Sequence, residues 1–308
     1  MNDIKIYIKI NTNKTRRNLL KSERKRTGII IKKIIYIIFI LFFCTISFKA
    51  YYIQSIEKRS ANFFIATHKD FPNNAIVNPA YKIICDERSQ LKMEYKLKII
   101  DTSKKNILYP KRGGYAEASK IYPIWKLYKT GRLSSKYVGL FHYRRLFSFK
   151  NDIPDLDNIF RDYDVILPNK LHFETSLKDQ YKIYHFEEFL DLCIDIIREK
   201  FPEYYPYTIG FTKKYEGNFY NVFIMKKNDF IKWGEFVFGV LLEFDKRLNL
   251  SSDYDIKTLV IFKKIKTPNQ YDAEYNLRVQ GFLSERLGNI FYDKYFSRRY
   301  EMDIVDAQ

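Results

Sequence analysis

The stretch KYVGLFHYRRLF, residues 136–147, places a short apolar strand directly before a group of polar side chains. Val138, Leu140 and Phe141 predict a buried strand, because a short apolar run of this kind packs into a core. The next four residues, His142-Tyr143-Arg144-Arg145, include no turn-forming Gly, Pro or Asn. An arginine does not lose its charge in a protein, so both guanidiniums need water or an anionic partner. The end of this strand is therefore a candidate anion-binding site.

The remainder of residues 60–300 alternates between apolar runs and amphipathic stretches. Strands are predicted at residues 63–66, 83–85, 137–141, 164–168 and 221–227. Helices are predicted at residues 117–131, 185–201, 230–248 and 277–291, and a loop or insertion at residues 249–269. Strands that alternate with helices are typical of an α/β domain with a mostly parallel sheet.

The ends of the predicted strands carry candidate ligand-binding residues. In open α/β sheets, ligands bind beyond the carboxyl ends of the strands. His68, the group 142–145 and the residues after Pro168 occupy such positions. The sequence contains no GxGxxG, P-loop, GxSxG or HExxH motif. The common nucleotide-binding, serine-hydrolase and zinc-protease signatures are therefore absent.

The three cysteines, Cys44, Cys85 and Cys193, stand apart in the sequence. Because there is no CxxC motif and no Cys/His spacing typical of zinc ligands, no zinc site is predicted. A disulfide between Cys85 and Cys193 is left open for a domain outside the cytosol.

The positive charge of the chain is concentrated near its N-terminus. The 308 residues carry a formal net charge of +18. Residues 5–33 hold eleven Lys or Arg and the single acid Glu23, so this segment supplies +10 of the net charge. A nucleic-acid-binding protein more often carries its basic stripe on the folded domain. We therefore interpret residues 1–33 as a basic cytosolic tail and predict no nucleic-acid partner.

Residues 34–48, IIYIIFILFFCTISF, follow this tail and contain no charge. Fifteen helical residues span about 22 Å, less than the roughly 30 Å hydrocarbon core, but apolar neighbours extend the run and flanking lysines can snorkel. We predict a transmembrane signal anchor at residues 34–53, with a buried core helix as the alternative. The basic excess before it predicts a cytosolic N-terminus and an exoplasmic or lumenal domain at residues 60–300. If the cell is eukaryotic, that lumen is the lumen of the Golgi or the endoplasmic reticulum.

Five blocks of the chain occur in a characteristic order: IATHK at 65–69, YVGLFHYRRLF at 137–147, DVILP at 164–168, NVFIMKK at 221–227 and GFLSERL at 281–287. Together they resemble a family of glycosyltransferases from bacterial capsule and exopolysaccharide gene clusters, catalogued as a domain of unknown function. The resemblance covers about residues 63–291, and the HYRR block is its most specific element.

The resemblance implies a Rossmann-like fold of the GT-A type, with a mixed, mostly parallel sheet and flanking helices. With the predicted anchor, it also implies a membrane-anchored glycosyltransferase. Such an enzyme moves a sugar from a nucleotide-sugar donor to a glycan, lipid or protein acceptor in surface polysaccharide or glycoconjugate synthesis.

GT-A enzymes usually carry an Asp-x-Asp motif at the end of a central strand, where it holds a divalent metal against the donor diphosphate. Here the equivalent position carries His142-Tyr143-Arg144-Arg145. We infer that Arg144 and Arg145 can neutralise the leaving diphosphate in place of a metal. If the strand continues, the two side chains point in opposite directions, so that at most one of them faces the donor. Asp162-Tyr163-Asp164 precedes its strand, which favours a cap or turn role. No metal ligand is predicted, and dependence on Mn²⁺ or Mg²⁺ stays open.

The resemblance also implies binding roles for residues at and near the strand ends. His68 and Lys69 end the first strand, where GT-A folds hold the nucleotide base and ribose, and Glu117 occupies the position of an acid in a family helix. Gln180 matches a Gln-Tyr pair on the acceptor side, and Asn221 lies where sugar hydroxyls can be bound. The substrate-binding residues predicted in this way are His68, Lys69, Glu117, His142, Arg144, Arg145, Gln180 and Asn221.

The catalytic base is the remaining part of the predicted site. An inverting transferase needs a base that takes the proton of the acceptor hydroxyl as it attacks the anomeric carbon. His185, which we expect to open a helix, and Glu285 are the predicted catalytic residues, with Asp179 and Glu187 as alternatives. The structural alternatives are a helix cap for His185 and an ion pair with Arg286 for Glu285.

The segment RGGYAEAS at residues 112–119 departs from the family pattern, which has an Asp/Gly/Asn-rich loop and a Glu-Leu-Thr-like turn there. Gly113 and Gly114 either let the backbone approach a phosphate or form a turn. The departure motivates an alternative function, a catalytically inactive carbohydrate-binding or scaffold protein with the same fold. The topology has an alternative as well, because bacterial nucleotide sugars are cytosolic: either the domain faces a lumen that is supplied with them, or the topology is inverted.

Overall fold

The computed structural model describes residues 36, 38–39, 61–71, 76–262 and 273–306. The chain divides into two compact units, Met1–Ile56 and Glu57–Gln308, and the fold below is that of the second. Apart from three helical, exposed residues, the predicted anchor at 34–53 lies outside the described residues. Within the described residues, no helix has both the length and the apolar composition needed to cross a bilayer.

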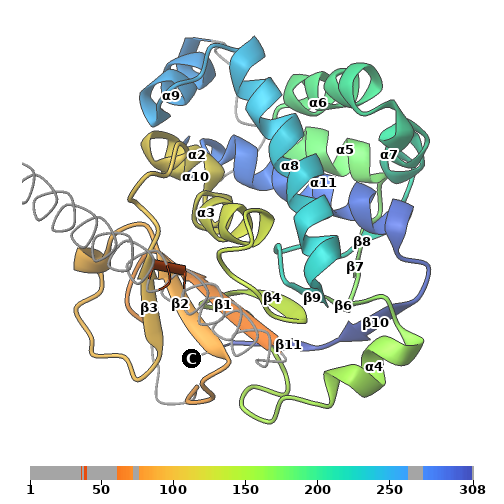
Figure 1. The fold of residues 1–308 in the computed structure, drawn as a ribbon. Coiled ribbons are helices and arrows are strands. Elements are labelled where there is room, and N and C mark those ends of the chain that lie inside the picture. The colour runs from red at the N-terminus through yellow and green to blue at the C-terminus, as the bar shows by residue number, and fades with distance from the viewer. Residues whose placement is uncertain (1–35, 37, 40–60, 72–75, 263–272, 307–308) are drawn as a thin grey trace, which may run out of the picture. The chain divides into compact units, whose positions relative to one another are not determined.

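A seven-stranded sheet forms the centre of the second unit (Figure 1). Its strands lie in the order β10 (Arg299–Met302), β6 (Val165–Pro168), β9 (Phe223–Lys226), β4 (Tyr137–His142), β1 (Ala61–Thr67), β2 (Tyr81–Cys85) and β3 (Lys98–Asp101). Strand β9 runs antiparallel to both of its neighbours, and every other neighbouring pair is parallel. The predicted mixed, mostly parallel sheet is therefore confirmed.

This topology brings several strand ends to one edge of the sheet, called here the carboxyl edge. The last residues of β1 pair with the ends of both neighbours, Ala66 with His142 and Thr67 with Cys85. Because β9 runs in the opposite direction, the residues that precede it lie at the same edge. Polar side chains from distant parts of the sequence therefore meet there.

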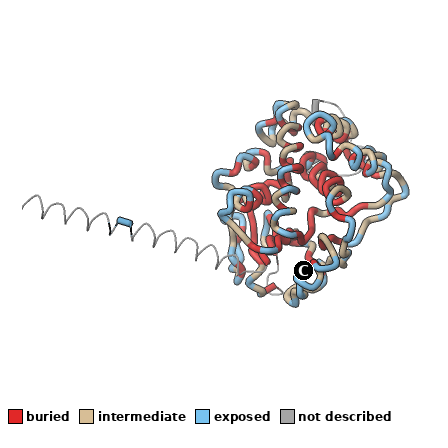
Figure 2. The backbone as a smooth tube through the Cα atoms, turned by 45° about the vertical axis from the view of Figure 1, so that its right-hand side comes forward, coloured by how far each residue is buried: buried red, intermediate tan, exposed pale blue. Residues whose placement is uncertain are grey.

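Each face of the sheet is buried under a separate apolar cluster. Phe64 and Leu140 lie in a cluster with the helices, whereas their neighbours Phe63 and Phe141 lie in the cluster on the other face. This alternation follows from the period of two along a strand. Buried positions accordingly run through the interior of the unit (Figure 2). The strands of the centre read as continuous apolar runs because both of their faces are covered.

Helices cover one face of the sheet (Figure 1). They are α3 (Ala118–Lys129), α5 (Leu177–Tyr184), α6 (Glu187–Lys200), α7 (Tyr205–Thr212), α8 (Lys227–Arg247) and α11 (Val279–Tyr295). The other face carries α4 (Leu156–Asp162) and a small antiparallel ribbon of β5 (Leu146–Phe147) and β11 (Ile304–Val305). The remaining elements are η1 (Arg88–Gln90), η2 (Tyr109–Lys111), α2 (Arg112–Tyr115), β7 (Leu171–His172), η3 (Pro202–Tyr204), β8 (Glu216–Gly217), α9 (Asp253–Phe262) and α10 (Ala273–Asn276).

Two predictions of local structure are wrong. Residues 249–269 were predicted as a loop or an insertion, and the loop alternative is wrong for residues 253–262, which form α9. The start of α9 is stabilised because the Asp255 carboxylate accepts hydrogen bonds from Ser251 and Ser252. Such a reciprocal Ser/Asp arrangement is a helix-start signal. His185 does not open a helix: it caps the C-terminus of α5, and α6 begins two residues later.

Cys85 and Cys193 are both free and buried. Cys85 lies in the cluster on the face away from the helices, whereas Cys193 belongs to α6 in the helical cluster. The two thiols are therefore separated by the sheet, and the disulfide that the sequence left open does not form.

Gly139 in the middle of β4 is required by close packing. A Cβ atom at this position would lie 2.5 Å from Phe63 Cδ1 and 2.8 Å from Phe141 Cε2. We expect Gly139→Ala to lower the free energy of unfolding by about 1–3 kcal/mol, because the rings must leave their rotamers. Gly210→Ala in α7 is the matched control, since no atom lies within 4 Å of its Cβ. Urea unfolding of both variants checks this, and equal stability of Gly139→Ala and wild type would contradict it.

Candidate functional site

Two adjoining cavities open at the carboxyl edge of the sheet. The larger cavity has a volume of about 490 Å³ and the smaller about 300 Å³. They share a wall formed by Ala116, Glu117, His142, Arg144 and Arg278. Cavities of this size are typical of small-molecule sites. A ligand that bridges the two cavities would pass these five residues.

The His142–Arg145 segment forms a tight turn at this wall. His142 N–H donates to Arg145 O over 3.2 Å, and Arg145 N–H donates to His142 O over 2.8 Å. The chain thus folds back into β5 and does not extend β4, so the expectation that the two arginines lie on opposite faces of a continued strand does not apply. Arg144 lines both cavities and Arg145 lines the larger one.

Three guanidiniums, those of Arg144, Arg145 and Arg278, lie at this edge. Arg145 lies 4.0 Å from the centre of the Tyr220 ring, while Arg144 and Arg278 lie over other tyrosine rings at 5.3 and 5.4 Å. Within the described residues, none of the three forms an ion pair. Such cation–π contacts orient a guanidinium and leave its donors available. The sequence did not point to Arg278, which precedes α11 without any local signal.

Two neutral histidines lie between these cations. Burial and the nearby positive side chains lower the pKa of His142 to about 3 and that of His68 to about 4. The backbone N–H of Arg144 donates to His142 Nδ1 over 3.2 Å. The neutral imidazole of His142 therefore carries its proton on Nε2, which is a donor for a ligand.

The smaller cavity is built from the ends of β1 and β2. Thr67, His68 and Asp86 line it, together with Lys120 of α3. Lys120 and Asp86 form a buried ion pair of 2.6 Å, which fixes both side chains. Lys69, which was predicted to bind substrate, lies 5.6 Å from the centre of the Tyr143 ring and lines neither of the two cavities.

The segment that departs from the family pattern is held by α9. The amides of Gly113 and Gly114 donate to the two carboxylate oxygens of Asp253, each over 3.0 Å. These amides therefore serve a structural contact in the described fold. The next residue but one, Ala116, has φ 50° and ψ −126°, a conformation that costs free energy for any residue except glycine. This turn directs Glu117 to the wall between the cavities.

A second strained turn precedes β9. Tyr220 and Asn221 have φ values of 78° and 51°. The Tyr220 N–H donates to Glu285 Oε1 over 3.1 Å, and the Asn221 amide donates to Glu117 Oε1 over 3.0 Å. Asn221 is buried and lines neither of the two cavities, so it contacts the site through Glu117. One turn thus positions two carboxylates, and persistent strain of this kind clusters at functional sites.

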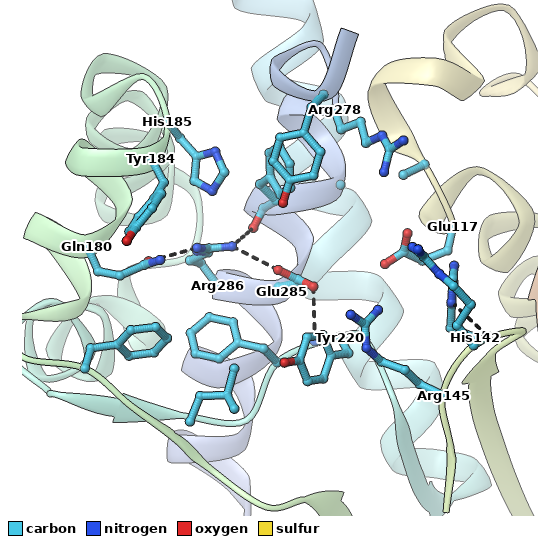
Figure 3. Close-up of a pocket in the computed structure, with 18 residues that line it drawn as sticks. Glu117, His142, Arg145, Gln180, Tyr184, His185, Tyr220, Arg278, Glu285 and Arg286 are labelled. Atoms are coloured by element: carbon cyan, nitrogen blue, oxygen red, sulfur yellow. Dashed lines mark hydrogen bonds and ion pairs between the residues drawn. The ribbon is translucent and has the colours of Figure 1, made fainter. Parts of the chain in front are cut away.

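Glu285 lies on the floor of the larger cavity, between Arg286 and Tyr220 (Figure 3). Burial raises the pKa of its carboxyl to about 7, although Arg286 opposes the shift and Glu117 adds to it. A carboxylate with a pKa near 7 can accept a proton at physiological pH and release it again. Such a carboxyl is chemically able to act as a general base.

The opposite wall of the larger cavity comes from α5 and α11 (Figure 3). Arg286 donates to Gln180 Oε1 over 3.0 Å and forms an ion pair of 2.9 Å with Glu285. His185 is stacked on Phe282 with 4.0 Å between ring centres. Burial and the charge of Arg286 lower the pKa of His185 to about 2, so its imidazole is neutral.

Within the described residues, no group of three His, Cys, Asp or Glu side chains is placed to hold a metal ion. The Asp162-Tyr163-Asp164 sequence lies at the start of β6, at the edge opposite the cavities. There the Asp164 carboxylate pairs with Arg298 over 2.9 Å, which ties β10 to β6. The Asp-x-Asp sequence of this chain therefore does not lie at the cavities.

Comparison with known proteins agrees with this architecture. One similar solved structure is described as the apo structure of the bifunctional glycosyltransferase WbbM; it has a TM-score of 0.58 and 20% sequence identity, over 80% of this chain and 45% of that chain. At this identity the likeness shows a shared Rossmann-like, GT-A-like fold, and the present chain spans less than half of that protein. No curated protein matches the chain. A family model matches residues 62–296, more than half of the chain, and the chain therefore belongs to the family of the domain of unknown function DUF4422.

Proposed function

We propose that this protein is a glycosyltransferase that moves a sugar from a nucleotide-sugar donor to the hydroxyl of an acceptor in glycan synthesis. The observation that carries the proposal is the pair of adjoining cavities at the carboxyl edge. Their common wall holds the guanidiniums of Arg144 and Arg278, neither of which forms an ion pair with a described residue. A two-substrate transfer needs two such binding spaces with a reacting point between them. The likeness in fold to a glycosyltransferase supports the same function.

The donor occupies the smaller cavity in this proposal. Its walls are the ends of β1 and β2, and ligands of α/β sheets bind beyond such ends. The neutral His68 and the fixed Asp86–Lys120 pair offer donors and acceptors for a nucleoside. The diphosphate then lies at the wall between the cavities, beside Arg144 and Arg278.

The guanidiniums stabilise the leaving diphosphate. Negative charge develops on it as its bond to the anomeric carbon breaks, and Arg144, Arg145 and Arg278, each held over a tyrosine ring, line the larger cavity beside it. Arginine also matches a phosphate with paired hydrogen bonds. The three side chains thus supply the charge stabilisation that a metal provides in other enzymes of this fold.

Glu285 is the base in this proposal. Its carboxylate takes the proton of the acceptor hydroxyl while the acceptor oxygen bonds to the anomeric carbon, and the nucleoside diphosphate leaves with the electron pair of the broken bond. The sequence offered His185 as a second candidate. A pKa of about 2 makes that imidazole a poor base, whereas the value of about 7 suits Glu285 to the task.

Turnover is expected to persist after chelation of divalent metals. If the three guanidiniums stabilise the leaving group, millimolar EDTA should change kcat by less than about twofold, because their charge takes the place of a metal ion. The assay measures release of nucleoside diphosphate with and without EDTA after dialysis. Complete loss of activity that Mn²⁺ or Mg²⁺ restores would contradict this assignment.

A panel of nucleotide sugars tests the function itself. We expect the full-length protein in detergent to release nucleoside diphosphate from one member of the panel, and Arg144→Ala to raise the KM for that donor. Arg161→Ala, an exposed arginine of α4 away from the cavities, is the control. If the protein binds sugars but turns over no donor, the alternative of an inactive carbohydrate-binding protein replaces the proposal.

We further propose that residues 34–53 anchor the protein in a membrane with a cytosolic N-terminus. The uncharged run 34–48 and the eleven basic residues before it support this. Protease protection of a C-terminal tag in sealed vesicles tests the orientation. A protected tag supports the lumenal arrangement, and digestion of the tag in intact cytosol-side-out vesicles would show the inverted one.

A further inference from the structure

We propose that the part of the larger cavity farthest from β4 binds an uncharged sugar ring, so that the acceptor is a neutral saccharide. This inference rests on the proposed function and goes beyond it, because it selects one acceptor class. The subsite consists of Phe173, Gln180, Tyr184, His185 and Phe282. In Figure 3, Gln180, Tyr184 and His185 lie across the cavity from Glu117, His142 and Arg145.

His185 is the polar centre of this subsite. Its side chain is 8% exposed, lines the cavity and has no hydrogen-bond partner for either ring nitrogen among the described residues. Its position is fixed by the stack on Phe282 and by its backbone N–H, which donates to Tyr181 O over 2.7 Å. A neutral imidazole offers one donor and one acceptor. A sugar hydroxyl, which both donates and accepts, can pair with such a group where it faces the cavity.

Among the described residues, the cation next to His185 and Gln180 is Arg286, whereas the guanidinium of Arg278 lies toward Glu117 and the wall between the cavities (Figure 3). Arg286 is 4% exposed, and its charge is already matched by Glu285 at 2.9 Å and shared with Gln180 at 3.0 Å. Its guanidinium also lies over the rings of Tyr181 and Phe219. An anionic acceptor group would therefore enter without a counter-ion, which is unfavourable in a buried site. The oxygen of Gln180 is used by Arg286, so its amide nitrogen remains as a donor to a hydroxyl.

Aromatic rings supply the remaining surface of the subsite. Phe173 packs edge-on against Phe219 with 5.6 Å between ring centres, and Tyr275 lies 5.0 Å from Phe282. Tyr184 is 38% exposed at the opening. A pyranose or furanose ring has an apolar face of C–H groups and a rim of hydroxyls. It therefore fits a wall of aromatic side chains that carries a few neutral hydrogen-bonding groups.

The test compares acceptors of matched shape and different charge. With the donor saturating, the full-length protein in detergent is offered neutral hexose disaccharides, the corresponding uronic-acid disaccharides, and polyprenyl phosphate in micelles. We expect transfer to a neutral disaccharide with an acceptor KM at least tenfold lower than that for its uronic-acid counterpart. Preference for the uronic acid or for the lipid phosphate would overturn the inference and leave the proposed function standing.

Variants identify the subsite. His185→Ala is expected to raise the acceptor KM at least tenfold and the donor KM less than twofold, with partial rescue in His185→Asn, which keeps a neutral donor and acceptor. Tyr254→Ala, an exposed ring on α9, is the control. Saturation-transfer NMR with the same disaccharides measures binding without turnover. Binding of neutral disaccharides that is equal in wild type and His185→Ala would overturn the assignment even if no donor is found.

Discussion

Glu285→Gln is expected to reduce kcat for sugar transfer by roughly a thousandfold, the usual contribution of a positioned general base. The amide keeps the shape of the side chain and can still accept the Tyr220 N–H, but it cannot take the proton of the acceptor hydroxyl. The KM for the nucleotide sugar should change little, because Glu285 lines the larger cavity and does not line the smaller one, where the donor is proposed to bind. Steady-state kinetics with both substrates measure the two effects separately.

The pH profile of the wild type gives an independent readout. The base is the ionised form, and burial raises the pKa of Glu285 to about 7. The value of kcat/KM should therefore be constant above this pKa and fall about tenfold per pH unit below it. Glu285→Gln should lose this pH dependence, whereas Glu235→Gln, an exposed glutamate on α8, should keep the wild-type profile. A flat wild-type profile between pH 5 and 8 would remove Glu285 from the role of base.

Arg145→Ala is expected to lower kcat by roughly a hundred- to a thousandfold, which is the usual effect in enzymes of removing one group that stabilises charge in the transition state. The guanidinium lies 4.0 Å from the Tyr220 ring centre and has no carboxylate partner among the described residues, so its charge is available to the leaving diphosphate. Arg145→Lys should recover only part of the rate, because an ammonium lacks the planar fork that matches phosphate oxygens. The measurement is kcat with donor and acceptor saturating.

The Tyr220 ring makes the origin of this effect testable. Tyr220→Leu removes the ring under Arg145 and should lower kcat less than Arg145→Ala does, because the charge remains but loses its orientation. Equal rates for Arg145→Ala and wild type would show that the diphosphate is stabilised elsewhere. A loss confined to the acceptor KM would place Arg145 on the acceptor.

Much of the fold is predictable from the hydrophobic pattern. The strands β1, β2, β4, β6 and β9 and the helices α3, α6, α8 and α11 have the expected periodicity, because each is covered on one or both faces by the core. Strand β3 is not visible in this way, since it lies at the sheet edge and none of its residues is buried. The reversed direction of β9 depends on tertiary pairing and has no local sequence signal.

The candidate site is predictable to the extent that it depends on strand ends. His68 and His142 were placed at the carboxyl edge by this rule, and Asp86, directly after β2, could have been found by the same rule. Arg278 and Phe282 come from the start of α11, which packs against the sheet through distant contacts. Tyr220 and Asn221 both have positive φ values, but tyrosine is not a residue type that indicates such a conformation. The turn that positions the carboxylates of Glu117 and Glu285 therefore could not be inferred from the sequence.

Mass spectrometry of the acceptor after incubation with donor tests the central claim most directly. With the matching nucleotide sugar, wild-type protein should add the mass of one sugar residue to a neutral saccharide and release one nucleoside diphosphate per product. Glu285→Gln and Arg145→Ala should form that product at least a hundredfold more slowly, at equal protein concentration and with unchanged unfolding temperature. The absence of product with every nucleotide sugar, or equal product formation by wild type and both variants, would contradict the account.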